Sequence, residues 1–281
     1  MPELPDLVYI QRFLHGSLPG RRIVSVEICD PIVVRCLLAV PFEQALSGRQ
    51  FKSVHRHGPF LVFELCADLQ LVVHPMLAGK FRLDPAAEPG GRRALSLKLG
   101  LQDNSALCYL DDKRMGKVYL TRHHETGQIP KFDNQGIDIL SAGFTEAAFL
   151  DLIAGQRKQV RVFLMDQSLL SAIGNAYADE VLFDAGIHPK TFCYQLSDNE
   201  RRNLFRSVGK VMSWGIATVA KAGSPIDVKV RDHMKVRNRR NLPCLVCGTT
   251  IRRAGVLGHD TFFCPVCQRA KRDQFIPWDK S

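Results

Sequence analysis

The spacing of apolar residues differs between the first and the second part of the chain. Up to about residue 122, short apolar runs and alternating apolar positions are separated by Gly, Pro, Asp or Asn. This pattern is typical of short strands and predicts an antiparallel β-sandwich or barrel. A helix is expected ahead of the strands over 3–14, where apolar residues recur at helical spacing. The expected strands are 22–29, 51–56, 60–66, 69–75, 95–102, 106–111 and 117–122.

From residue 144 the apolar spacing becomes helical. Two of the expected helices begin with capping signals, because Thr145 precedes Glu146 and Ser197 has Glu200 three residues on. Residues 123–143 are polar and rich in turn-forming residues, so we expect a linker there. The expected helices are 144–155, 158–167, 175–186 and 197–220.

The positive charge is concentrated in the last third of the chain. The 281 residues carry a net charge of +10, yet residues 1–200 hold 21 Lys and Arg against 23 Asp and Glu. Residues 201–281 hold 17 against 5. This excess favours a polyanionic partner such as nucleic acid, with a solvated basic face as the alternative.

Composition excludes several classes of protein. Apolar residues make up 46% of the chain, which is enough for a substantial core and too much for a mainly disordered protein. No apolar run approaches the ~20 residues that a membrane-spanning helix needs. The first residues lack the basic and apolar regions of a signal peptide, so we expect no secretion.

Four of the nine cysteines are spaced as metal ligands. Cys244, Cys247, Cys264 and Cys267 form two close pairs with 16 residues between them. This is the spacing of a zinc ribbon, in which four thiolates close the coordination shell of one structural Zn²⁺. Gly248 is expected at positive φ, and 249–251 and 261–263 are expected as the hairpin strands. The alternatives are two disulfides or four unrelated thiols, which the absence of a secretion signal disfavours.

Pro2 and Glu3 are candidates for catalysis. Removal of Met1 would expose the secondary amine of Pro2, and an α-amine with a reference pKa of about 7.7–8.0 is partly neutral at pH 7. Such an amine can attack the aldehydic carbon of a sugar and form an iminium. Glu3 lies beside it and can protonate a ring oxygen or a leaving group. Taken alone, these residues are a weak signal.

Three segments together carry a family resemblance. They are PELPDL at 2–7, IGNAYADEVLFDAGIHP at 173–189 and the ribbon ending DTFFCPVCQ at 260–268. In this order and spacing they closely resemble the formamidopyrimidine-DNA glycosylase / endonuclease VIII (Fpg/Nei) family of base-excision repair enzymes, over nearly the whole chain. The resemblance implies an α+β fold and a base-flipping glycosylase with a lyase step. The implied parts are an N-terminal catalytic β-sandwich domain (1–122), a linker (123–143), a helix–two-turn–helix DNA-binding domain (144–236) and a four-cysteine zinc finger (237–281).

The resemblance also implies individual roles. Pro2 becomes the nucleophile and Glu3 the proton donor. In the loop His74–Gly79, Met76 or Leu77 would fill the space left by the flipped base, and in the loop Asp111–Gly116, Met115 would wedge between bases. Asn175 would hold backbone phosphate at a helix start. The complete set of expected DNA contacts is His74, Met76, Leu77, Lys113, Arg114, Met115, Lys158, Asn175, Arg239 and His259.

The chain departs from the family pattern at several positions. Pro59 stands where the family has a lysine used on phosphate, and His259 replaces an arginine of the zinc hairpin. Lys113 replaces an arginine that probes the orphan base, and the strand around 92–96 is altered. The segment 222–236, which covers the flipped base in oxidised-purine enzymes, looks short. We therefore expect poor activity on 8-oxoguanine and weak δ-elimination.

Three functions compete. A DNA repair glycosylase with AP-lyase activity explains Pro2 and Glu3. A paralogue that binds DNA damage or abasic sites without efficient strand cleavage is favoured by the two lost cations. A zinc-ribbon transcription or RNA factor explains the ribbon and the charge, but not the other two motifs. We expect an enzyme that acts as a monomer on damaged duplex DNA, away from membranes. It would lie in the cytoplasm with the nucleoid of a bacterium, or in the nucleus of a eukaryote.

Overall fold

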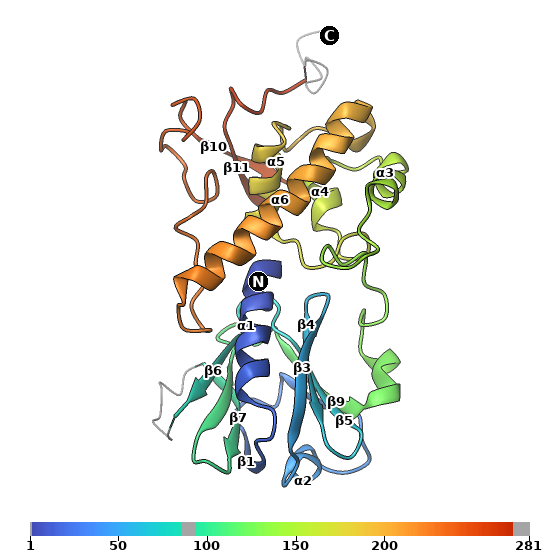
Figure 1. The fold of residues 1–281 in the computed structure, drawn as a ribbon, viewed down its shortest axis with the longest axis vertical. Helices are drawn as coiled ribbons and strands as arrows, with labels where there is room; N and C mark the ends of the chain where they lie inside the picture. Colours follow the sequence, from blue (N-terminus) through green and yellow to red (C-terminus); the bar gives the residue numbers. More distant parts are fainter. Residues whose placement is uncertain (1, 86–93, 272–281) are drawn as a thin grey trace. The chain divides into compact units, whose positions relative to one another are not determined.

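The computed structural model describes residues 2–85 and 94–271, drawn in Figure 1. The chain forms two compact units. Unit 1 comprises Met1–Asn134 and Val219–Val230, and unit 2 comprises Gln135–Thr218 and Arg231–Ser281. The altered positions 92 and 93, and the end of the expected zinc finger from 272 on, lie outside the described residues. None of the described helices is both long and apolar enough to cross a membrane.

Unit 1 is a β-sandwich with helix α1 (Leu4–Ser17) packed against strand β3. One described sheet has the order β1-β7-β8-β6 and the other the order β2-β9-β5-β4-β3. The strands are β1 (Ile23–Ile28), β2 (Val34–Cys36), β3 (Phe51–His57), β4 (Phe60–Leu65), β5 (Leu69–His74), β6 (Lys80–Asp84), β7 (Leu95–Leu101), β8 (Ala106–Leu110) and β9 (Lys117–Arg122). The expected sandwich is confirmed, with one correction. Strand β2 runs parallel to β9, whereas all other neighbouring pairs are antiparallel.

Strand β4 shows why its segment of the sequence is a continuous apolar run. All its residues except Glu64 are buried. One face lies in the sandwich core, and on the other face Phe60 and Val62 pack against Ile129 and Phe132. A strand covered on both faces has no reason to alternate. The segment that we expected as a linker begins with the 3-10 helix η1 (His123–Gln128) and supplies these two covering residues.

Unit 2 combines helices with the cysteine hairpin. The elements are α3 (Glu146–Ala154), α4 (Val160–Met165), α5 (Asn175–Asp184), the 3-10 helix η2 (Cys193–Gln195), α6 (Asp198–Ala222), β10 (Arg252–Val256) and β11 (His259–Phe263). The last turn of α6 belongs to unit 1. Both expected caps are present. Thr145 Oγ1 accepts from the Ala148 amide at 3.2 Å, and Ser197 and Glu200 bond reciprocally through their side chains and amides.

The first hairpin strand lies later than the sequence predicted. Strand β10 begins at Arg252, whereas we expected residues 249–251. That stretch instead closes the first cysteine knuckle, because Cys244 N–H donates to the Thr249 carbonyl at 2.9 Å and Asn241 N–H donates to the Ile251 carbonyl at 3.1 Å. Gly248 has a φ of +74°, as its position after Cys247 predicts.

Candidate active site and DNA-binding elements

Pro2 and Glu3 immediately precede helix α1. Glu3 is the N-cap, and it forms a capping box with Asp6 in which each carboxylate accepts the other residue's backbone N–H. The Glu3 amide donates to Asp6 Oδ2 at 2.8 Å. Glu3 and Asp6 are only 4% and 5% exposed. The two carboxylates are therefore fixed beside Pro2, at the helix end where the backbone dipole favours negative charge.

A narrow pocket lies beside Pro2 in unit 1. It is lined by Pro2, Asp6, Tyr9, Ile10, Gly79, Lys80, Val219, Ile226, Asp227, Val228 and Lys229. The lining mixes two carboxylates with two lysines around one aromatic ring. The free space is about 10 Å³, which holds about one water molecule. A reactive amine at this place would meet its substrate among charged groups of both signs.

The loop His74–Gly79 follows strand β5 and presents Leu77. The Met76 amide donates to His74 Nδ1 at 3.0 Å, and Met76 takes a left-handed φ of +47°. Burial lowers the pKa of His74 to about 4, so the ring is neutral near pH 7 and can accept this bond. Leu77 is 53% exposed at the loop's apex, whereas Met76 is partly buried. Of the two candidates, Leu77 is the side chain that this loop offers to a partner.

The loop Asp111–Gly116 joins β8 to β9. Asp111 accepts from the amides of Lys113 and Gly116, at 3.0 and 2.6 Å. At the apex of the loop, Lys113 is exposed and Met115 is 39% exposed. Arg114, at a φ of +55°, is paired through Nε with Asp30 Oδ2 at 2.9 Å. The backbone bonds of Asp111 hold the loop in shape, so its exposed side chains are presented from a fixed turn.

Tyr109 is a residue that the sequence did not single out, and its hydroxyl lies against a glycine of each loop. A Cβ atom added to Gly79 or to Gly116 would collide with the Tyr109 hydroxyl. Each loop therefore ends on a glycine because the tyrosine occupies the space that a side chain would need. Tyr109 is buried at 3% exposure. Glycines at the ends of two unrelated loops were the only sequence signal of this contact.

Pro59 lies in the two-residue turn between β3 and β4. His57 pairs with Phe60 across the turn, and Gly58 supplies its positive φ of +53°. The Arg56 guanidinium donates to the Gly58 carbonyl at 2.9 Å. His57 stacks on Phe132, and its Nε2 lies 2.8 Å from the Phe132 carbonyl. Pro59, at the position of the family's lysine, thus carries no charge itself, and the Arg56 guanidinium lies against the turn.

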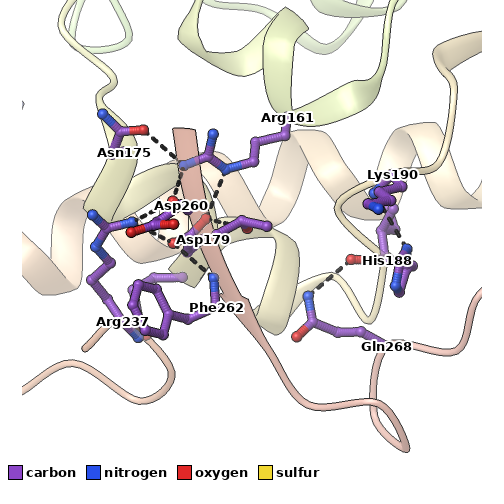
Figure 2. A network of polar contacts seen from close by, with 12 residues as sticks. Arg161, Asn175, Asp179, His188, Lys190, Arg237, Asp260, Phe262 and Gln268 are labelled. Carbon is purple, nitrogen blue, oxygen red and sulfur yellow. Dashed lines mark hydrogen bonds and ion pairs between the residues drawn. The ribbon is translucent and has the colours of Figure 1, made fainter. Parts of the chain in front are cut away.

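A buried ionic network forms the centre of unit 2 (Figure 2). Arg161 of α4 donates from Nε to Asp179 Oδ1 at 2.9 Å, and from NH2 to Asn175 Oδ1 at 2.8 Å and the Asp260 carbonyl at 3.0 Å. Arg237 donates from NH1 to Asp179 Oδ2 at 2.8 Å and to the same carbonyl at 2.9 Å. The two arginines therefore join helices α4 and α5 to the start of strand β11.

Asn175 is the first residue of α5, after Gly174 at the N-cap. Arginine can only donate hydrogen bonds, so the contact with Arg161 fixes the Asn175 oxygen inward. The amide nitrogen then becomes the end that Asn175 can turn toward an anion. A phosphate at this helix start would also lie at the positive end of the α5 backbone dipole.

The four cysteines converge at the base of the hairpin. Their Sγ atoms all lie within 4.8 Å of one another. Three of the separations are 3.9 Å for Cys244–Cys267, 3.4 Å for Cys247–Cys264 and 3.5 Å for Cys247–Cys267. A tetrahedral zinc with Zn–S bonds near 2.3 Å would place its sulfurs about 3.8 Å apart. The cluster therefore fits a zinc ion with little adjustment.

The remaining expected DNA contacts also lie in unit 2. Lys158 Nζ pairs with Asp166 at 2.7 Å, and Arg239 donates to the Pro243 carbonyl at 3.2 Å. His259 is exposed at the first position of β11. Beside it, Asp260 pairs with Arg253 at 3.0 Å. Unit 1 thus holds the candidate catalytic residues and both exposed loops, and unit 2 holds Asn175, the hairpin and the cysteines.

This combination of fold and site defines a class, the zinc-finger DNA glycosylases of base-excision repair. Family models for the formamidopyrimidine-DNA glycosylase N-terminal domain, its H2TH domain and the zinc finger found in FPG and IleRS match residues 1–118, 135–225 and 241–270. The chain belongs to the formamidopyrimidine-DNA glycosylase family, whose members are DNA glycosylases and AP lyases.

Relatives match along their whole length. A formamidopyrimidine-DNA glycosylase of Bacillus subtilis is 32% identical, with 96% of this chain and 100% of the relative covered. That of Listeria innocua is 29% identical over the same shares. The Lactococcus lactis Fpg in complex with abasic-site DNA superposes with a TM-score of 0.85 at 26% identity, covering 95% of this chain and 100% of that one.

Proposed function

We propose that this protein removes damaged bases from duplex DNA and cleaves the resulting abasic site through the Pro2 amine. The observation that carries the proposal is the position of Pro2 beside the capping-box carboxylates Glu3 and Asp6, in a lysine-lined pocket. The solved relatives hold abasic-site DNA, an oxidised pyrimidine or Fapy-dG. Lesions of these kinds therefore supply the first substrates to test.

In the proposed reaction the neutral Pro2 nitrogen attacks C1′ of the damaged nucleotide. The bond from C1′ to the base breaks, and the base leaves with a proton while Glu3 protonates the ring oxygen as the sugar opens. The resulting iminium makes the C2′ proton acidic, and its loss expels the 3′ phosphate by β-elimination. Hydrolysis of the iminium then frees Pro2. The exposed Leu77 fills the space in the duplex, and Met115 wedges beside it.

Phosphate contacts come from unit 2 in this proposal. Asn175 presents its amide nitrogen, and Lys158, Arg239 and His259 add donors. One Zn²⁺ held by Cys244, Cys247, Cys264 and Cys267 would stabilise the hairpin, and four thiolates leave no open position for chemistry. The protein would act as a monomer.

The expected substrate range follows from the short segment after helix α6 and from the missing cations. Residues 222–236 leave little protein to enclose a flipped purine, which favours poor activity on 8-oxoguanine. A proline at 59 and a histidine at 259 favour slow δ-elimination, because neither residue is a permanent cation that could contact phosphate.

A panel of duplexes tests the proposal. Each duplex carries an abasic site, a ring-opened purine, a dihydropyrimidine or 8-oxoguanine. We expect cleavage at the abasic site and excision of either the ring-opened purine or the dihydropyrimidine. The main product should carry a β-elimination end. The competing function, a damage-binding paralogue, predicts tight binding to the abasic duplex with no cleavage product, and that result would replace the present proposal.

A further inference from the structure

A second pocket lies in unit 1, beside helix α2 (Phe42–Leu46). Its volume is about 460 Å³, which lies in the range of sites that bind a ligand. Figure 1 shows α2 at the end of the β-sandwich away from the start of α1. An occupant of this pocket would therefore leave Pro2 accessible.

Strand ends of the five-stranded sheet support the pocket. Leu69, the first residue of β5, is 6% exposed and pairs with Arg122, the last residue of β9. The Leu37 amide donates to the Leu120 carbonyl at 2.9 Å, which ties the connection between β2 and α2 to the same sheet. The pocket is thus built on regular elements, and a ligand would find it already formed.

The apolar lining of the pocket continues to the surface. Seven of the ten lining residues are apolar. Leu69 is buried, whereas Val40 is 46% exposed and Ala39 and Ala67 are also exposed. The Cys36 thiol donates to the Val40 carbonyl at 3.3 Å, which fixes this part of the rim. A ligand that fills the pocket can therefore extend across an apolar rim beyond it.

The charged residues of the lining are Arg49, Arg122 and Glu125. Arg49 donates from Nε to the Ala45 carbonyl at 3.0 Å, which leaves its two terminal nitrogens for a ligand. Arg122 is exposed, and in the described part of the chain its side chain has no ion-pair partner. Guanidinium groups bind carboxylates through paired hydrogen bonds. Arginine is also enriched, and lysine depleted, in protein–protein interfaces.

The three kinds of lining group together favour a peptide. The arginines need a negatively charged acceptor, the Glu125 carboxylate needs an N–H donor, and the apolar walls need an apolar side chain. A peptide that carries an acidic residue next to a large apolar one supplies all three. A fatty acid offers no donor to Glu125. None of the ten lining residues is aromatic, so the pocket offers no surface on which a nucleobase could stack.

We propose that this pocket is a docking site for a partner protein, which inserts a peptide segment with an acidic residue next to a large apolar one. Arg49 and Arg122 bind the carboxylate of the segment, and its apolar side chain packs between Leu69 and Val40. Because the pocket and Pro2 lie at different ends of unit 1, the partner stays bound while the protein acts on DNA. The inference does not depend on the chemistry at Pro2.

Selection from phage-displayed random heptapeptides, with the intact protein as bait, tests the inference. The selected peptides are synthesised, and fluorescence anisotropy measures their dissociation constants for wild type, Arg49→Gln, Arg122→Gln and Val40→Asp. Lys52→Gln, which removes a charge from an exposed residue of β3 outside the pocket, is the matched control. Urea unfolding of each variant checks that unit 1 remains folded.

We expect the selected peptides to place Asp or Glu next to Leu, Ile, Phe or Trp. Each arginine substitution should weaken their binding about tenfold or more, because a charge-assisted hydrogen bond is lost. Val40→Asp should act in the same direction by placing a negative charge on the rim, and Lys52→Gln should leave binding unchanged.

Three results would overturn the inference. The first is a selection that enriches no peptides, or only peptides without an acidic residue. The second is a set of affinities that Arg49→Gln, Arg122→Gln and Val40→Asp leave unchanged in folded protein. The third is displacement of the peptides by duplex DNA, which would assign their binding to a nucleic-acid surface.

Discussion

Arg161 and Asp179 form an ion pair with a 2.9 Å Nε–Oδ1 separation, and their side chains are 1% and 0% exposed. Asp179 also accepts from Arg237, from the Thr261 hydroxyl at 2.7 Å and from the Phe262 amide at 3.2 Å. Its carboxylate is therefore fully bonded without water. A buried charge with this many partners ties the cysteine hairpin to helix α5.

Removing one member of this network should strongly lower the stability of unit 2. Arg161→Met leaves Asp179 and the Asp260 carbonyl without a main partner in a buried place, and we expect a loss of about 3–5 kcal/mol in the free energy of unfolding of unit 2. Urea unfolding measures it. Lys210→Met is the control, since Lys210 pairs with Asp184 but is 69% exposed, and it should cost less than about 1 kcal/mol. Equal effects of the two substitutions would show that the network does not stabilise the unit.

Loss of zinc should affect the hairpin and spare the β-sandwich. We expect Cys247→Ser or chelation to remove the metal and to weaken DNA binding more than it lowers the stability of unit 1, because metal binding and folding of the hairpin are coupled. Elemental analysis and binding assays measure both effects. Cys29→Ser, at an exposed cysteine outside the cluster, is the control. Protein purified without chelators that lacks zinc would contradict the assignment.

His74 should make the protein sensitive to acid. Burial lowers its pKa in the folded state to about 4, against about 6.5 in the unfolded chain. Between these values the unfolded state binds more protons, so this contribution to stability is present above pH 6.5 and is lost as the pH falls through 4. His74→Asn keeps an acceptor for the Met76 amide but cannot titrate. Between pH 6.5 and pH 4 we expect the free energy of unfolding of wild type to fall by up to about 2–3 kcal/mol more than that of His74→Asn. An equal fall in both proteins would show that His74 does not cause the acid sensitivity.

Restoring a cation at the β3–β4 turn should accelerate strand cleavage. Pro59→Lys adds a positive charge at the tip of the hairpin, and we expect more phosphate binding and a larger share of δ-elimination product. Pro59→Gln changes the backbone in the same way without the charge and serves as the control. His259→Arg should act in the same direction from unit 2. Gels that separate β- from β,δ-elimination ends would show the gain, and equal products from Pro59→Lys and Pro59→Gln would exclude a role for the charge.

The sequence predicted the regular elements well where the pattern was long. The strands that became β1, β3, β4, β5, β7, β8 and β9 carried alternating or continuous apolar runs. Strand β2, with three residues, and helix α2 (Phe42–Leu46), with five, are too short to show a period. Strand β6 is also absent from the prediction, since its KFRLD pattern includes three charges. The late start of β10 followed from hydrogen bonds of the cysteine knuckle, which periodicity does not contain.

The candidate site could be predicted only in part for a similar reason. Residues with a chemical motif, such as Pro2, Glu3 and the four cysteines, stand out in the sequence. Arg161, Tyr109 and Tyr9 do not, because each acts through a partner that is remote in the chain. A lone arginine in a helix is normally exposed, and nothing local shows that Asp179 buries this one. The contacts of Tyr109 with two glycines, and of the Tyr9 hydroxyl with the Ser224 carbonyl, exist only in the folded unit.

The central claim is that the Pro2 nitrogen forms the covalent intermediate. Incubation with abasic duplex DNA and borohydride, followed by proteolysis and mass spectrometry, locates the trapped sugar. The account predicts an adduct on the peptide that begins at Pro2, and its absence from Pro2→Gly and from protein that retains Met1. An adduct on a lysine, or one that persists in both altered proteins, would contradict it.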